Sequence, residues 1–230
     1  MSVLWAALAL LISRLVHRPL LGRFGAGTVQ HLVRLPGNLL HELAHAVVML
    51  ITGYTVAGLS VSLFDPSGRG HVQPGPAWTS LARPWLTNLF SPVAPAFVGL
   101  AALTGLHAWS GLPALPTSVD GVAPVLRAVP WASWQLWTAL ALGFSVTAEM
   151  APSDVDLSVW WRPALVVGLL LVGLGWAMQR TDPGYLLTLA TAVDPRLVGF
   201  TARALTLAVA SGVTLGPVAA LYGALRSAAS

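Results

Sequence analysis

Two histidines and a glutamate interrupt an apolar stretch of the chain, GNLLHELAHAVVML (37–50). His41, Glu42 and His45 form the pattern HExxH. On a helix, residues four apart lie on one face, so both imidazoles point the same way and the glutamate lies beside them. The pattern therefore predicts that His41 and His45 bind one Zn²⁺ ion, and that Glu42 is the general base that takes a proton from water.

A second interpretation of the same three residues is open. Ionisable side chains inside a membrane are costly and normally paired, so these side chains could make interhelical hydrogen bonds or line a proton path. Metal binding is favoured because the pentapeptide would arise by chance in only about one such sequence in a thousand. The other candidate ligands, His31, His71 and His107, each stand alone. Solitary histidines near an interface are commonly solvated or hydrogen-bonded.

The elements that position these residues are expected to be membrane helices. Of 230 residues, 56% are hydrophobic and 9% are charged, and the mean hydropathy is +0.74. Seven tryptophans cluster at segment ends, as expected at a membrane interface. These features predict an all-α polytopic membrane protein of about six transmembrane or re-entrant helices with one small β-hairpin. The apolar segments are 3–16, 35–54, 85–109, 131–150, 163–178 and 197–225.

The arrangement predicts a single integral-membrane domain, residues 1–230, with a metal-site core at about 36–161. The chain has no cysteine, so any transition metal must be held by nitrogen and oxygen. All the basic residues are arginines, and Arg14, Arg18, Arg23 and Arg34 fall between the first two apolar segments, which indicates a cytoplasmic side. The arginines form no basic patch, so nucleic acid is not an expected partner. The first segment is expected to be a retained helix, not a cleaved signal peptide.

One stretch departs from the helical pattern. In GLSVSLFDPSGRGHV (58–72), Leu59, Val61 and Leu63 alternate with serines before the turn sequence DPSG, which is typical of a strand, a turn and a second strand. The hairpin is either an ordinary surface loop or an edge strand that binds a peptide. In the second case Leu59, Val61 and Leu63 are the candidate substrate-binding residues.

The combination of HExxH in a membrane helix, a small hairpin and a later aspartate motif resembles the site-2 protease family of intramembrane zinc metalloproteases. The resemblance covers about residues 38–161. It implies that His41, His45 and a distant aspartate bind zinc, that Glu42 activates water, and that a membrane segment of the substrate is unwound and cut. NLFSPVAPAFVG (88–99) is similar to the family's helix beside HExxH, where small residues allow close packing.

The candidates for the third ligand lie in AEMAPSDVDLSVWW (148–161), which contains Glu149, Asp154 and Asp156. The family's aspartate commonly lies in an Asn-Pro-containing motif that ends in Leu-Asp-Gly, and this chain has no such string. The stretch instead resembles the Pro-Ser-x-x-Asp-Leu pattern of compact, divergent relatives. That resemblance favours Asp156, with Asp154 as the alternative. Asp154 and Asp156 are two residues apart on an opening helical turn, so only one of them can face the histidines. Ser153 and Asp156 also form a capping-box pattern. Glu149 precedes Pro152 and is expected to end its helix, as a gate or a partner of a ligand.

The predicted ligands His41 and Asp156 must lie at the same depth in the membrane to bind one ion. Three apolar segments separate the start of the His41 helix from Asp156, so complete crossings would leave the two residues on opposite faces of the membrane. At least one segment must therefore be partial or broken. The segment around Pro92 and Pro95 and the proline-rich region 111–130 are the predicted places.

The sequence as a whole predicts a zinc endopeptidase of transmembrane or membrane-proximal peptides, held in the lipid bilayer as a multi-pass protein of the cell membrane. Its partners would be membrane-protein or peptide substrates, and its oligomeric state is open. The alternative is a non-catalytic membrane protein, either a degenerate protease relative that binds partners or a small cation or proton transporter.

Overall fold

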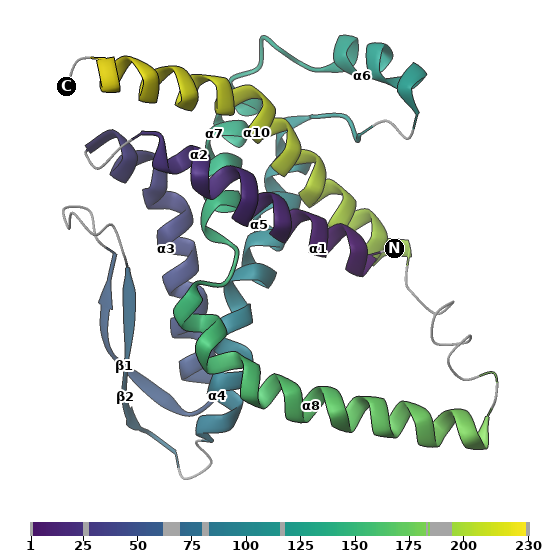
Figure 1. The fold of residues 1–230 in the computed structure, drawn as a ribbon. Helices are drawn as coiled ribbons and strands as arrows, with labels where there is room; N and C mark the ends of the chain where they lie inside the picture. Colours follow the sequence, from purple (N-terminus) through teal and green to yellow (C-terminus); the bar gives the residue numbers. More distant parts are fainter. Residues whose placement is uncertain are drawn as a thin grey trace.

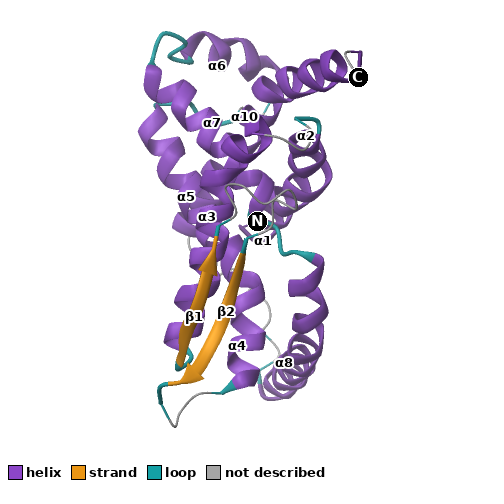
Figure 2. Cartoon of the chain, turned by 90° about the vertical axis from the view of Figure 1, so that its left-hand side faces the viewer, coloured by secondary structure: helices purple, strands orange, loops and turns teal. Residues whose placement is uncertain are grey.

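The computed structural model describes residues 2–24, 28–61, 70–79, 83–115, 118–182, 184 and 195–228. Within these ranges the fold is a bundle of helices with one two-stranded sheet beside it (Figures 1 and 2). Each of the six predicted apolar segments contains a helix, so the helical expectation and the single hairpin are confirmed. The predicted turn Asp65–Gly68 lies outside the described residues.

The N-terminal helices lie across the bundle. Helix α1 (Ser2–Ile12) continues through a π-helical turn (Ser13–His17) into the short α2 (Arg18–Gly22), and α3 (Thr28–Ile51) follows. The π turn buries His17 against the ring of Phe144, with the ring centroids 5.1 Å apart, and His17 Nε2 lies 3.2 Å from Ser211 Oγ. Arg18, the first residue of α2, is thereby held near the end of α7.

Helix α7 (Trp134–Glu149) lies at the centre and packs against α3, α5 (Ala94–Ser110) and α10 (Pro195–Ala228). The main core combines leucines and alanines of α5, α7 and α10 with Ala9 of α1. The other helices of the described ranges are α4 (Pro84–Phe90), α6 (Val122–Ala128) and α8 (Asp154–Thr181), with 3₁₀ turns at Ser91–Val93 and Val119–Gly121.

Helices α3 and α7 run parallel to one another. Gly37 lies against Ser145, and one turn further along both helices His41 lies against Glu149. A methyl group at Gly37 would lie 2.1 Å from the Ser145 carbonyl oxygen, so only glycine permits this approach. Gly37 N also donates to Ser145 Oγ at 2.8 Å. The contact fixes the axial register between the two helices.

This register explains how the two halves of the predicted site reach one level. At a rise of about 1.5 Å per residue, His41 lies about 20 Å from the first residue of α3, and the last residue of α7 lies about 22 Å from the first residue of α7. The segment that stops beside the histidines is therefore α7. The segment at Pro92 and Pro95 does contain a 3₁₀ turn, but it continues into α5 as far as Ser110.

Three helical stretches are long and apolar enough to cross a membrane: Pro84–Ser110, Asp154–Thr181 and Pro195–Ala228. Helix α7, with 16 residues, is shorter than the roughly 20 residues that a crossing needs. Helix α1 has 11 residues before the π turn that joins it to α2, and the continuous stretch contains Arg14 and Arg18. Helix α3 has 24 residues but carries the ionisable groups of HExxH. Three membrane-length helices, and not six, are therefore established within the described residues, which is compatible with a membrane protein.

The hairpin pairs β1 (Tyr54–Ser60) with β2 (His71–Ala77) in antiparallel register, with Leu59 opposite Val72 and Ser60 opposite His71. Both strands contact α3 (Figure 2). Because β2 includes Pro74 and Pro76, which have no N–H group to donate, β2 is the poorer of the two as a template for a further strand.

Candidate metal centre

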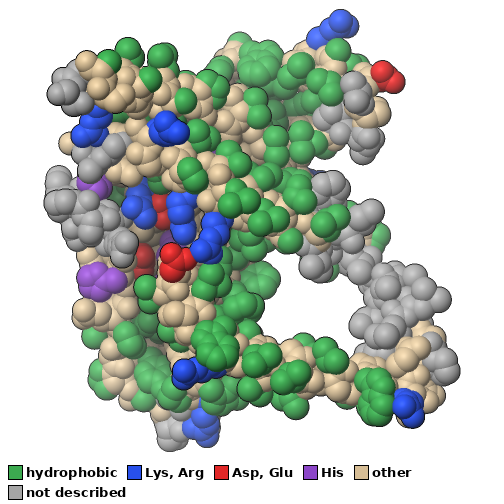
Figure 3. All heavy atoms as spheres, in the orientation of Figure 1, with side chains coloured by type: hydrophobic (Ala, Val, Ile, Leu, Met, Phe, Trp, Pro, Cys, Tyr) green, Lys and Arg blue, Asp and Glu red, His purple; other side chains and the backbone are tan. Residues whose placement is uncertain are grey.

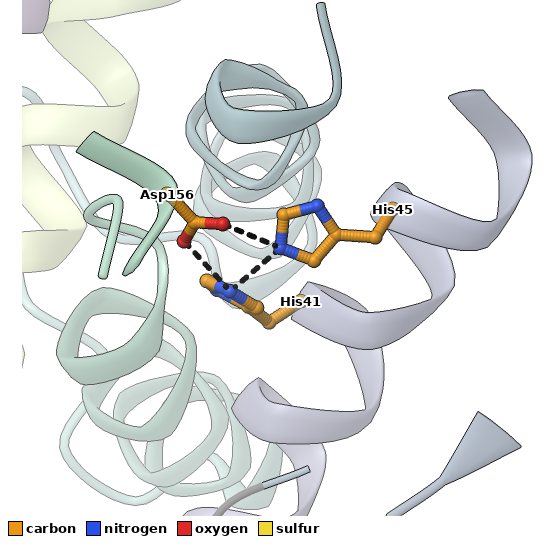
Figure 4. A group of neighbouring side chains, drawn as sticks. All are labelled: His41, His45 and Asp156. Atoms are coloured by element: carbon orange, nitrogen blue, oxygen red, sulfur yellow. Dashed lines mark hydrogen bonds and ion pairs between the residues drawn. The ribbon is translucent and has the colours of Figure 1, made fainter. Parts of the chain in front are cut away.

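Helix α3 and the start of α8 bring His41, His45 and Asp156 together (Figure 4). The two Nε2 atoms are 3.0 Å apart, and they lie 3.7 and 3.5 Å from the two oxygens of Asp156. Two donors that each lie about 2.0–2.1 Å from a tetrahedral ion are about 3.3–3.5 Å apart. The three side chains therefore fit a group that could hold one metal ion, as the sequence predicted for the two histidines.

Hydrogen bonds orient both imidazoles. His41 Nδ1 lies 2.6 Å from the backbone carbonyl oxygen of Glu149, and a carbonyl can only accept, so this nitrogen carries the proton. His45 Nδ1 lies 2.9 Å from Ser91 Oγ. In a neutral imidazole the proton on Nδ1 leaves a lone pair on Nε2, which is the form that binds a metal. The Nε2 lone pair of His41 faces the Asp156 carboxylate, and His45 adds a second lone pair there when its Nδ1 donates to Ser91 Oγ, an arrangement that a cation would stabilise.

Asp156 is positioned by the cap of its own helix. Its Oδ2 atom accepts from Ser153 N at 2.7 Å, and Ser153 Oγ accepts from Asp156 N at 3.1 Å, which completes the predicted capping box. Asp154 points elsewhere: its side chain is 86% exposed and pairs with Arg14 at 2.6 Å. Of the two candidate aspartates, the structure brings Asp156, and not Asp154, to the histidines.

Glu149 occupies the last residue of α7, as predicted. Its carboxylate forms a bidentate ion pair with Arg34, in which Arg34 NH2 lies 3.2 Å from Oε2, while its backbone carbonyl holds His41. Helix α3 therefore contacts Glu149 through Arg34 and through His41, which lie two helical turns apart. Such an arrangement restrains the ring of His41.

Glu42 is 5% exposed and lines the same cleft as the three candidate ligands. It has no hydrogen-bond or ion-pair partner among the described residues. Gly70, just before β2, lies against its side chain: a methyl group at Gly70 would be 2.6 Å from Glu42 Cγ and 2.8 Å from Oε1. The Glu42 carboxylate is thus available for proton transfer, and Gly70 packs against its side chain.

The cleft has a volume of about 910 Å³ and is bounded by α2, α3, β2, α4 and the start of α8. Strand β2 contributes His71, Val72 and Pro74 to it. The predicted substrate-binding residues Leu59 and Val61 do not line it, and Leu63 lies outside the described residues. The hairpin therefore borders the site through β2. The prediction that Leu59 of β1 and Val61 line the site is wrong.

Sequence reasoning did not identify Ser91 and Arg34 as parts of the site. Signals for both exist: Arg34 is a charge inside a mostly apolar helix, which requires a partner, and Ser91 precedes Pro92 at a helix break. Of the solitary histidines, His71 lines the cleft, whereas His31 and His107 do not.

Comparison of the chain with protein-family models, with curated proteins and with solved structures gives no match. The resemblance to site-2 proteases therefore depends on the motif residues in the sequence alone.

Proposed function

We propose that this protein is an intramembrane zinc metalloprotease that hydrolyses peptide bonds in transmembrane or membrane-proximal segments. The observation that carries the proposal is the convergence of His41, His45 and Asp156 from elements far apart in the sequence, with Glu42 on the same cleft. Zinc rather than a harder ion is proposed because two imidazoles and one carboxylate leave a fourth position open, which is the ligand set of catalytic zinc.

A bound zinc ion would supply Lewis acidity, polarising the scissile carbonyl and lowering the pKa of a water molecule. Glu42 then takes the proton of the attacking water and returns it to the leaving amine. Its buried carboxylate suits this role because, among the described residues, no arginine forms an ion pair with it. Asn38, Thr87 and Asn88 also line the cleft and offer polar groups to a peptide backbone.

The proposal accounts for the placement of a water-dependent site in an apolar chain. The cleft joins Glu42 to polar and charged side chains on α2, α3 and α8, whereas the far part of α8 has no buried residue and presents apolar side chains such as Leu169 and Leu170. A peptide segment that leaves the bilayer at this point would meet the histidines in the same cleft.

The test uses purified protein in detergent with a panel of fluorogenic apolar peptides, and it compares the wild type with Glu42→Gln. We expect zinc-dependent cleavage that falls by at least about a hundredfold in the variant. Absence of cleavage of every peptide by zinc-loaded wild-type protein would contradict the proposal. Metal binding with biological function retained in Glu42→Gln would instead support the non-catalytic alternative.

A further inference from the structure

The charged groups of the cleft are paired, with one cationic exception among the described residues. Glu149 pairs with Arg34, Asp154 pairs with Arg14, and Asp156 faces the two histidines. The remaining charged side chains that line the cleft are Glu42, which the proposed function assigns to proton transfer, and Arg18. Figure 3 shows arginine and acidic side chains gathered in one region of this face, beside hydrophobic side chains.

Arg18 lies partly buried with a single neutral partner. Its NH2 group donates to the backbone carbonyl of Ala151 at 3.1 Å, and the described part of the chain offers it no carboxylate. A guanidinium group has five N–H donors in a planar fork, so most of its donors are left for another acceptor. A partly desolvated cation without a counter-charge is unfavourable, and the structure presents it on the wall of the cleft.

The position of Arg18 relates it to the peptide path. Ala151 belongs to the short connection between α7 and α8, and Asp156 follows five residues later. A peptide held at the histidines and Asp156 therefore comes within reach of Arg18 over about five extended residues or fewer. The acceptor that matches a planar fork of N–H donors is a carboxylate, which can bind it through two hydrogen bonds.

We propose that Arg18 recognises a carboxylate of the bound peptide, which makes segments with an acidic residue near the scissile bond the preferred substrate class. This inference rests on the proposed function, because it places the peptide in the same cleft. A phospholipid phosphate has related chemistry, but a lipid headgroup at Arg18 would occupy space that the peptide must cross. Arg14 is more exposed and does not line the cleft, and it pairs with Asp154.

Binding can be measured without cleavage in the Glu42→Gln protein, reconstituted in phosphatidylcholine nanodiscs. The probes are short fluorescent peptides of leucine and alanine with a single Glu placed at successive positions, each paired with its Gln counterpart. We expect at least one position at which the Glu peptide binds about fivefold or more tightly than the Gln peptide. Adding Arg18→Gln should abolish that preference, and Arg18→Lys should keep part of it.

Arg23→Gln is the matched control, because it removes one charge from the same arginine cluster at a position that does not line the cleft. It should leave the Glu preference unchanged. The proposal would be overturned if the Glu42→Gln protein shows no preference for Glu peptides. It would also be overturned if that preference persists after Arg18→Gln is added. Arg18-dependent affinity for phosphatidylglycerol nanodiscs without any Glu preference would also overturn it and would assign Arg18 to lipid. Gel filtration of each variant identifies misfolded protein.

The two proposals fail in distinguishable ways. Glu-selective peptide binding through Arg18, with no zinc-dependent cleavage by the wild type, would reject only the protease. Zinc-dependent cleavage with equal affinity for Glu and Gln peptides would reject only the role of Arg18.

Discussion

Asp156 uses one carboxylate for two contacts, since it caps α8 and faces both histidines. Asp156→Asn keeps an oxygen but removes the negative charge, so zinc affinity should fall by about an order of magnitude or more, and activity should fall further. Asp154→Asn should keep most of both, because Asp154 is exposed and pairs with Arg14. Competition titrations with a zinc chelator measure the affinities; the reverse pattern would reassign the ligand.

Gly70 provides a second test at the level of a single residue. A methyl group there would collide with Glu42, whose side chain must then move. Gly70→Ala should therefore keep its metal and lower the rate by about tenfold or more, because the general base leaves its position. Metal content and the cleavage rate are measured on the same preparation. Glycine at position 58, where the nearest atom to an added methyl group is 3.5 Å away, is the control, and Gly58→Ala should be nearly silent.

The site residues differ in how far the sequence could identify them. His41, Glu42 and His45 lie within five residues on one helix, so helical periodicity alone places them together. Asp156 was favoured by its pattern, and the structure brings it to the histidines. The Arg34–Glu149 pair spans 115 positions, and no local pattern encodes which distant charge a residue meets.

At the level of elements, the contact between α3 and the end of α7 supports the candidate metal centre. Arg34 holds the Glu149 side chain, and the Glu149 carbonyl holds His41. Arg34→Gln and Glu149→Gln should each weaken metal affinity by about tenfold, because the His41 ring loses its restraint. Cobalt-substituted protein provides a spectroscopic measurement, since its visible bands report the coordination geometry. Unchanged spectra and affinities in both variants would show that the ion pair does not position His41.

The helices were predictable as elements, because long apolar segments between charged ends have a strong signal. Their register was not. Gly37 against Ser145 sets where α7 stops relative to α3, and that contact depends on tertiary packing and not on periodicity. The error in the predicted substrate-binding strand has the same cause, because tertiary packing decides which strand faces the cleft. The alternating pattern indicated Leu59 and Val61, whereas β2, which is rich in proline and glycine, lies at the cleft.

At the scale of the whole molecule, the exposed apolar surface of α8 is compatible with a membrane protein. Its outer part presents Leu169, Leu170 and Val172, each more than half exposed, and no residue of α8 is buried among the described residues. The chain has no cysteine, so single-cysteine variants can be labelled without background. In intact vesicles Leu170→Cys should resist a water-soluble maleimide, whereas Asp154→Cys at the cleft should react. Rapid labelling of Leu170→Cys would place α8 in water.

The central claim concerns the metal, and metal analysis of purified protein tests it most directly. We predict about one zinc ion per chain in the wild type, and in Glu42→Gln as well, because Glu42 moves a proton without holding the ion. His41→Ala and His45→Ala should each lose the zinc, because removing either imidazole leaves only two of the three converging ligands. Protein without zinc in the wild type, or zinc content unaffected by either histidine substitution, would contradict the account.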